Sequence, residues 1–389
     1  MDYSKLLSDK VQVMKPSGIR KFFDMLGEMK DVIGLTVGQP DFPTPYHISN
    51  AAVESITKNK TYYTSNSGLP ELRVGIANYL NRRFGLSYEP MHEVIVTVGG
   101  SEAIDMALRA IINPGDEIIV PEPCFVCYSP LIEIMGGVAV PLYTEVKDCF
   151  KVTPEKLEPL LTEKTKAVIL SYPNNPTGAI MTKEDLEKIV PYFIERDILV
   201  LSDEIYSELT YGVEHTSIAS FEGMRERTIV VNGFSKAYAM TGWRLGYVAA
   251  PEPLVREILK LHQYGIMCAS TASQFAGVEA INNGDADVIR MKEQYDFRRT
   301  YVVSRLHDMG VECFLPEGAF YVFPRIDNFG MSSEEFCQRL LEEKRVAIVP
   351  GSAFGSGSEG FARISYAYSI EHLTAALDRM EEFIKDIKK

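Results

Sequence analysis

The chain has 389 residues, of which 46% are apolar and 24% charged, and a formal net charge of −13 at pH 7. This length predicts two or three compact units with sizeable buried cores, and the composition excludes an intrinsically disordered chain. The acidic charge argues against a surface that neutralises nucleic-acid phosphates or anionic lipid, so any anion-binding site must be local.

The first segment, residues 1–18, lacks the basic stretch, apolar run and small-residue cleavage site of a secretory signal. No stretch approaches the roughly 18 uninterrupted apolar residues of a membrane-spanning helix. Most of the six cysteines lie inside apolar runs, which is typical of free thiols in a reducing compartment. We therefore expect a cytoplasmic protein.

Between about residues 93 and 250, short apolar and β-branched runs alternate with segments of helix length. Because these runs are apolar on both faces, they predict a largely parallel sheet with helices on each side. The runs are EVIVTVG, DEIIVPEP, GVAVPLY, TKAVILSYP, ILVLSDEIY, TIVVNGFSK and LGYVAA. Ligands bind at the carboxyl ends of strands in such sheets, so we expect the polar groups that follow several runs to share one crevice.

The pattern changes after residue 284. A helical stretch over about 284–308 leads to short strand-like runs, a helix through SSEEFCQRLLEEK and a terminal helix, which together predict a smaller α+β unit. The turn-rich segment GLTVGQPDFPTP belongs to an N-terminal region that we expect to join this unit. The predicted division is 1–45 as an N-terminal segment packing with the small domain, 46–285 as the large domain and 286–389 as the small domain.

Two polar groups follow apolar strands in the large domain. Lys236 follows TIVV, where partial desolvation would lower its pKa and favour the amine that forms Schiff bases; an ordinary surface lysine is the alternative. Asp203 follows ILVL, where a buried carboxylate needs a cation such as a protonated pyridine nitrogen; a helix N-cap is the alternative. Tyr206 would present its phenol to the O3′ atom of the same ring.

Three further motifs suit anionic or polar ligands. Val98-Gly-Gly-Ser-Glu102 turns from a strand into a helix, whose free N–H groups would bind a phosphate unless the motif is a plain turn and cap. In SYPNNPTG, the proline after Asn175 favours an extended backbone that leaves the side-chain amide free. Arg363, in the apolar run ARISYA, needs a partner, either a ligand carboxylate or a structural ion pair.

In this order along the chain, the motifs resemble those of the class I aminotransferases, which have fold type I among pyridoxal-phosphate enzymes. The resemblance runs from PSGIRKFFDM through VGQPDFPTP, YYTSNSGLPELR, VGGSEAI, NNPTG, SDEIY, GFSKAYAMTGWRLGY and GAFYVFP to VPGSAFG and RISYA. It implies a mostly parallel seven-stranded sheet flanked by helices, a smaller α+β domain and pyridoxal 5′-phosphate as cofactor. The details look most similar to the aromatic or broad-specificity aminotransferases.

The resemblance also implies how the cofactor ring is held. Lys236 would form the Schiff base and then shuttle the proton during amino transfer. Asp203 would pair with the pyridine nitrogen, while Tyr206 and Asn175 would bind O3′. Phe125 would stack on the ring.

For the phosphate, the resemblance implies backbone contacts from Gly100, Ser101 and Glu102, with Arg244 as the counter-ion. Tyr63 would reach the phosphate of the neighbouring subunit, which implies a homodimer with shared sites.

Three residues, Gly38, Asn175 and Arg363, would bind the substrate, with its α-carboxylate at Gly38 and Arg363. The chain departs from the family pattern at Gly233, where many relatives carry a phosphate-binding serine. Ser235 is the candidate replacement, with a weak contact to the phosphate.

The implied activity is amino transfer from an aromatic or broad-range L-amino acid to a 2-oxo acid such as 2-oxoglutarate, with ping-pong kinetics. An apolar pocket would suit large donor side chains, and candidates for its lining are Ile19, Phe22, Tyr62, Phe125 and Tyr321. No second arginine for a dicarboxylic side chain is evident in the motifs.

The main alternative is a carbon–sulfur β-lyase, which would use the same residues on the same fold. A transcription regulator with an aminotransferase-like domain is disfavoured, since only about thirty residues precede the first motif. A metal or redox role for Cys124-Phe-Val-Cys127 is also disfavoured, because no second cysteine or histidine pair stands nearby in the sequence.

Overall fold

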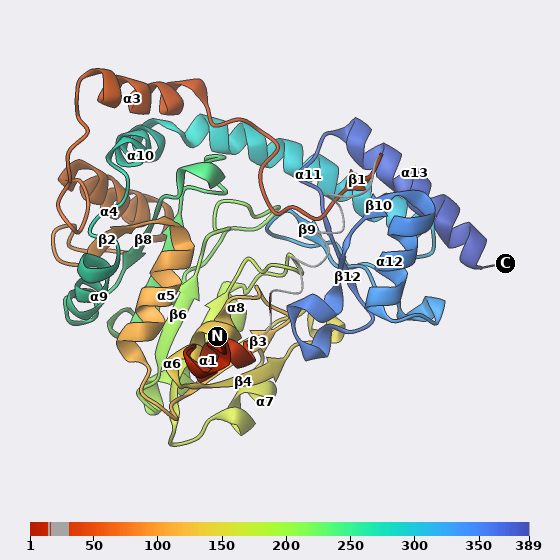
Figure 1. Ribbon diagram of the computed structural model, residues 1–389, viewed down its shortest axis with the longest axis horizontal. Coiled ribbons are helices and arrows are strands. Elements are labelled where there is room, and N and C mark those ends of the chain that lie inside the picture. Colours follow the sequence, from red (N-terminus) through yellow and green to blue (C-terminus); the bar gives the residue numbers. More distant parts are fainter. Residues whose placement is uncertain (15, 17–30, 389) are drawn as a thin grey trace.

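A seven-stranded sheet forms the centre of the larger part of the molecule (Figure 1), in the order β2-β8-β7-β6-β5-β3-β4. The computed structural model describes residues 1–14, 16 and 31–388. The seven predicted runs all form strands, and the prediction of a mostly parallel seven-stranded sheet is confirmed. The strands are β2 (Val94–Thr97), β3 (Glu117–Glu122), β4 (Val138–Tyr143), β5 (Thr165–Ser171), β6 (Leu199–Asp203), β7 (Thr228–Gly233) and β8 (Gly246–Ala249).

Helices cover both faces of this sheet because its central strands are apolar on both sides. Leu201 packs with the helices of one face, whereas its neighbour Val200 points to the other. The first face carries α5 (Gly99–Ile111), α6 (Tyr128–Met135) and α9 (Glu252–Gly265). The second carries α3 (Tyr46–Thr57), α4 (Pro70–Phe84), α7 (Pro154–Leu157), α8 (Lys183–Glu195) and α10 (Thr271–Asn283).

The direction of the strands brings six carboxyl ends to one edge of the sheet. Strand β8 is antiparallel to both β2 and β7, while β7, β6, β5, β3 and β4 pair in parallel. As a result every strand except β8 ends at the same edge. The segments that follow β2, β5, β6 and β7 carry the polar motifs of the sequence.

A second, smaller part is built around two short sheets. Strand β1 (Ile33–Gly34) pairs with β10 (Val346–Ala347), and the other sheet has the order β11-β12-β9. Its strands are β9 (Tyr321–Val322), β11 (Val349–Pro350) and β12 (Ala362–Ser365). They pack with α11 (Asp285–Asp308), α12 (Ser333–Lys344) and α13 (Ile370–Ile387). Helix α11 extends between the two parts (Figure 1).

The described parts of the N-terminal segment have different neighbours. Strand β1 belongs to the smaller part, whereas α1 (Asp9–Val13) lies against α6, where Lys10 Nζ donates to Ile134 O at 3.2 Å. Within the described ranges, no helix is both long and apolar enough to cross a membrane.

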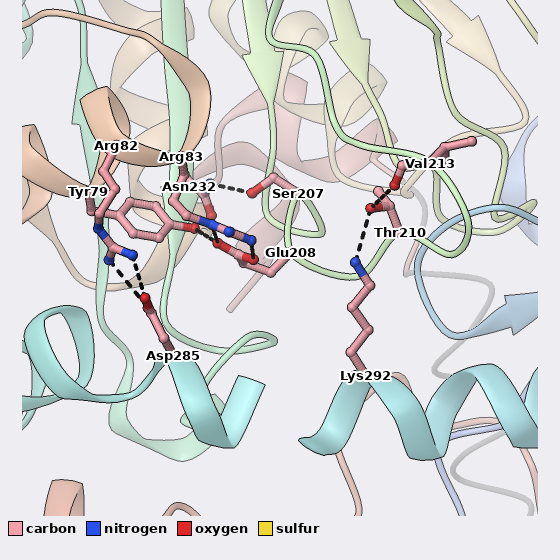
Figure 2. A network of polar contacts seen from close by, with 10 residues as sticks. All are labelled: Tyr79, Arg82, Arg83, Ser207, Glu208, Thr210, Val213, Asn232, Asp285 and Lys292. Atoms are coloured by element: carbon pink, nitrogen blue, oxygen red, sulfur yellow. Dashed lines mark hydrogen bonds and ion pairs between the residues drawn. The ribbon is translucent and has the colours of Figure 1, made fainter. Parts of the chain in front are cut away.

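A polar network anchors the segment that follows β6 (Figure 2). The buried carboxylate of Glu208 accepts hydrogen bonds from Tyr79 Oη at 2.6 Å and from Arg83 Nε at 2.9 Å, both on α4. Asn232 Nδ2, on β7, donates to Ser207 Oγ at 3.0 Å. Because Ser207 and Glu208 directly follow Tyr206, these contacts fix the backbone that carries this tyrosine.

We expect Glu208→Ala to lower the free energy of unfolding by about 2 kcal/mol, because the buried Tyr79 hydroxyl loses its acceptor and Arg83 loses its partner. Urea unfolding of the purified protein measures this change. The matched control is Glu54→Ala, which removes an exposed carboxylate paired with Lys58 and should leave the unfolding midpoint unchanged. Equal midpoints for the two variants would contradict the anchoring role.

Candidate active site

A cavity of about 340 Å³ opens at the edge where the six strands end, within the range of roughly 300–1,000 Å³ that is usual for small-molecule sites. Most of the site residues predicted from the sequence line it. They are Gly38, Gly100, Ser101, Phe125, Asn175, Asp203, Tyr206, Ser235, Lys236, Arg244 and Arg363. Tyr321, a predicted pocket residue, lines it as well, together with Tyr128, which sequence reasoning did not single out.

Lys236 lines this cavity. Its Nζ donates to Gly38 O at 2.6 Å and lies 5.8 Å from the ring centroids of both Tyr206 and Phe320. Burial lowers the pKa of Lys236 to about 8, and the positive charges of Arg363 and Arg244 act in the same direction. The neutral, nucleophilic form of this amine is therefore far more populated at physiological pH than it is for an ordinary lysine, although the ammonium still predominates.

The carboxylate of Asp203 is buried at the end of β6 and has only neutral donors around it. Its Oδ1 accepts from Ile205 N at 3.2 Å, and its Oδ2 lies 2.7 Å from the Tyr128 hydroxyl, which donates to it. Burial raises the pKa of Asp203. No lysine, arginine or histidine of the described chain forms an ion pair with it, so a cationic group in the cavity would complement its charge.

Tyr128, on the first turn of α6, is a cavity residue in contact with Asp203 that the sequence motifs did not reveal. Its hydroxyl bridges Asp203 and Ser171, whose Oγ is 2.9 Å away. The only signal in the sequence is its position three residues after Phe125, in the segment that follows β3. A buried phenol in this place fixes the orientation of the carboxylate.

The start of α5 forms a part of the cavity wall that is suited to an anion. Gly99 has φ +73°, and a Cβ atom there would lie 2.6 Å from Arg244 Nη2, so the guanidinium packs directly on the glycine. Gly100 and Ser101 then place the first turn of the helix at the cavity wall. Backbone N–H groups, the helix dipole and Arg244 together suit a phosphate.

The structure gives a steric reason for the departure at Gly233. A Cβ atom at this position would lie 2.9 Å from both Gly246 Cα and Leu245 O, so no side chain fits without movement of the backbone. Ser235, the candidate replacement, lines the cavity, as do Ser101 and Ser171.

Some predicted residues do not line the cavity. The Glu102 carboxylate is directed away, toward Val98 N and His262. Tyr62 and Tyr63 are 68% and 77% exposed and lie outside the lining. Ile19 and Phe22 fall outside the residues that the structure describes.

Arg363 is buried at the other end of the cavity. Its Nη1 donates to Asn175 Oδ1 at 2.8 Å and its Nη2 to Thr36 O at 2.6 Å, while Nε has no partner in the described chain. Its guanidinium carbon lies 4.6 Å from the ring centroid of Tyr321. The alternative of a structural ion pair is wrong for the described residues, because none of their carboxylates pairs with Arg363; the arginine is available to an anionic ligand.

The C-x-x-C pair has the properties of buried thiols. All six cysteines are free, as expected from the sequence, and burial raises the pKa of both Cys124 and Cys127. Thiols with raised pKa values are poor metal ligands and poor nucleophiles.

Comparison with known proteins is consistent with this geometry. The family model for aminotransferase class I and II matches residues 30–380. The chain is 52% identical to the putative aminotransferase YugH of Bacillus subtilis, over 97% of this chain and 98% of that protein. It is 45% identical to an aspartate aminotransferase of Pyrococcus abyssi, over 98% and 99% of the two chains. The structure of an aromatic aminotransferase from Pyrococcus horikoshii superposes with a TM-score of 0.91 at 44% identity, covering 94% of this chain and 99% of that one.

We expect the Lys236 amine of the ligand-free protein to react with acetic anhydride as a group of pKa about 8. Its labelling rate should rise with pH and level off by about pH 9, because the neutral amine is the reactive form. Lys147, whose pKa is raised by Glu145, should still gain reactivity above about pH 10. Peptide mass spectrometry measures both rates in one sample, and parallel profiles for the two lysines would contradict the desolvated site.

Proposed function

Since the chain belongs to the class I and II aminotransferase family, whose members depend on pyridoxal 5′-phosphate, we propose that it moves the amino group of an aromatic or large apolar L-amino acid to a 2-oxo acid such as 2-oxoglutarate. The observation that carries this proposal is the placement of Lys236, Asp203 and Arg363 in one cavity. The names of the relatives include aspartate and aromatic aminotransferases, so they support the reaction more strongly than the donor.

The residues present fit the cofactor. The first turn of α5, through Gly100 and Ser101, would bind the phosphate together with Arg244. Asp203, oriented by Tyr128, would keep the pyridine nitrogen protonated, since it is a buried carboxylate without a cation of its own. When bound, the cofactor supplies an aldehyde for amine exchange and a ring that withdraws electrons from the substrate α-carbon.

Around the ring, Tyr206 and Asn175 would hold O3′ and Phe125 would cover one face. The Tyr206 hydroxyl lies 2.8 Å from the Tyr321 hydroxyl, and the Asn175 amide oxygen is bound by Arg363. Both side chains therefore have a fixed orientation before any ligand arrives. Ser235 would make a weaker contact with the phosphate.

Lys236 moves the proton. Its Nζ would accept the substrate α-proton and return it on the cofactor side of the site, a role that requires a neutral amine at working pH. The desolvation and the two arginines that lower its pKa provide that amine. Alternating release of a 2-oxo acid and binding of a second one gives ping-pong kinetics.

The substrate α-carboxylate would bind Arg363, beside Asn175 and Gly38. Among the described lining residues, the two arginines are thus assigned to the α-carboxylate and to the phosphate, and none is left for a distal carboxylate. The aromatic side chains of Phe125 and Tyr321 border the remaining space. This balance favours an aromatic donor over aspartate.

We further propose a homodimer in which Tyr63 reaches the phosphate of the partner subunit. Support comes from four exposed apolar side chains, Tyr62, Tyr63, Tyr264 and Met267, on two segments that are joined where Asn66 Nδ2 donates to Met267 O at 2.9 Å. The free cysteines support a reducing, cytoplasmic compartment. The division of the chain at about residues 45 and 285 is supported by the separate cores of the two parts.

The lysine assignment is tested with Lys236→Ala. We expect this variant to lose the visible absorbance of lysine-linked cofactor and to lower kcat by about 10³-fold or more. Lys188→Ala, which alters an exposed lysine on α8, is the matched control and should keep both properties. Normal absorbance in the Lys236 variant would contradict the assignment.

The carboxylate is tested with Asp203→Asn. The variant should still bind the cofactor but lower kcat by about 100-fold or more, because a neutral amide no longer keeps the ring nitrogen protonated. Single-turnover measurements with an α-deuterated donor should show slower proton removal with an isotope effect. A variant that turns over at the wild-type rate would exclude this role.

The donor preference is tested with a panel of amino acids and 2-oxoglutarate. We expect kcat/KM for phenylalanine and tyrosine to exceed that for aspartate by about tenfold, which corresponds to about 1.4 kcal/mol of transition-state binding. A tenfold preference for aspartate would overturn the aromatic assignment and would leave the aminotransferase reaction itself intact.

A further inference from the structure

A buried pair of side chains lies behind the start of α5, outside the cavity. Glu102, on the first turn of this helix, accepts a hydrogen bond from Val98 N through Oε2, and its Oε1 lies 2.8 Å from His262 Nδ1. His262, on α9, has no exposed surface. Its Nε2 has no hydrogen-bond partner in the part of the chain that the structure describes. Because an ionised carboxylate only accepts hydrogen bonds, Nδ1 carries the hydrogen that is donated to Glu102.

The position of this carboxylate matters because an anion is expected at the same end of the helix. Gly100 and Ser101, two and one residues before Glu102, line the cavity with the first turn of α5. A carboxylate that turned toward these N–H groups would occupy them or repel a phosphate, since like charges at close range destabilise each other. The two hydrogen bonds hold it on the opposite side.

We propose that His262 is a positioning residue for the cofactor phosphate, a role that rests on the function proposed above. By donating to Glu102 from α9, His262 keeps the carboxylate away from the first turn of α5 and leaves the N–H groups at the cavity open to a dianion. The Val98 N–H, which is also at the helix start, is satisfied by the same carboxylate and takes no part in phosphate binding.

Two substitutions of His262 separate this role from simple packing. In His262→Leu the side chain fills the space between α9 and α5 but donates no hydrogen bond. In His262→Asn the amide NH₂ can take the place of Nδ1–H and donate to Glu102. If His262 only fills space, the leucine variant should bind pyridoxal 5′-phosphate more tightly than the asparagine variant. If His262 positions Glu102, the asparagine variant should bind it more tightly.

The readout is the dissociation constant of full-length, cofactor-stripped protein for pyridoxal 5′-phosphate and for pyridoxal, which lacks the phosphate. For His262→Leu we expect about a tenfold weaker constant for pyridoxal 5′-phosphate and a change below about twofold for pyridoxal, since only the phosphate meets the displaced carboxylate. His262→Asn should restore most of the affinity. Glu102→Gln in the leucine background should also restore it, because the amide carries no charge.

Several results would overturn the positioning role of His262. Equal losses for both ligands, or no loss for either, would overturn the positioning role, as would a failure of Glu102→Gln to restore affinity. If His262→Leu does not fold, the dissociation constants of the wild type, His262→Asn and Glu102→Gln are compared for the same two ligands. Changes of equal size for pyridoxal 5′-phosphate and pyridoxal would then refute the proposal. Failure of the wild-type protein to link either aldehyde to Lys236 would instead refute the proposed function.

Discussion

The chemistry of the site depends on one electrostatic arrangement: a desolvated amine and a desolvated carboxylate at the carboxyl ends of neighbouring parallel strands. Lys236 follows β7 and Asp203 ends β6, so both reach the same edge of the sheet. Neither group forms an ion pair with an oppositely charged side chain of the described residues. Lys236 donates to a carbonyl oxygen, and Asp203 accepts from a phenol and a backbone N–H. Burying both groups is costly unless a ligand complements them. A cationic ring nitrogen would compensate the charge of the carboxylate, and an aldehyde would react with the neutral amine to form a Schiff base.

The rest of the site provides local positive charge for anionic groups in a protein whose net charge is negative. With a net charge of −13, the chain cannot attract phosphate or carboxylate groups through its overall field, and it places its positive charge locally. Arg244 and the start of α5 form one positive end of the cavity, and Arg363 forms the other. Burial is the main cause of the lowered pKa of Lys236, and the same two arginines lower it further, so the positive charges that would bind anions also help to activate the amine.

The sequence predicted those features that follow from local pattern. Strands were evident because both of their faces are apolar, and the site residues could be placed because parallel strands end at one edge. Contacts between distant segments were not predictable: the Tyr128 hydroxyl meets Asp203 across 75 positions, and His262 meets Glu102 across 160. The alternative of an ion pair at Arg363 failed for the same reason, since Asn175 and Thr36 approach it from other strands and loops. Side-chain direction at Glu102 depends on α9, which the motif itself does not contain.

The most direct test of the central claim is a crystal structure of the protein grown with pyridoxal 5′-phosphate. The account predicts density that continues from Lys236 Nζ to the C4′ carbon, with an Asp203 carboxylate oxygen at about 2.8 Å from the ring nitrogen, as in a charge-assisted hydrogen bond. A ring whose nitrogen points away from Asp203, or a cofactor bound outside this cavity, would contradict it.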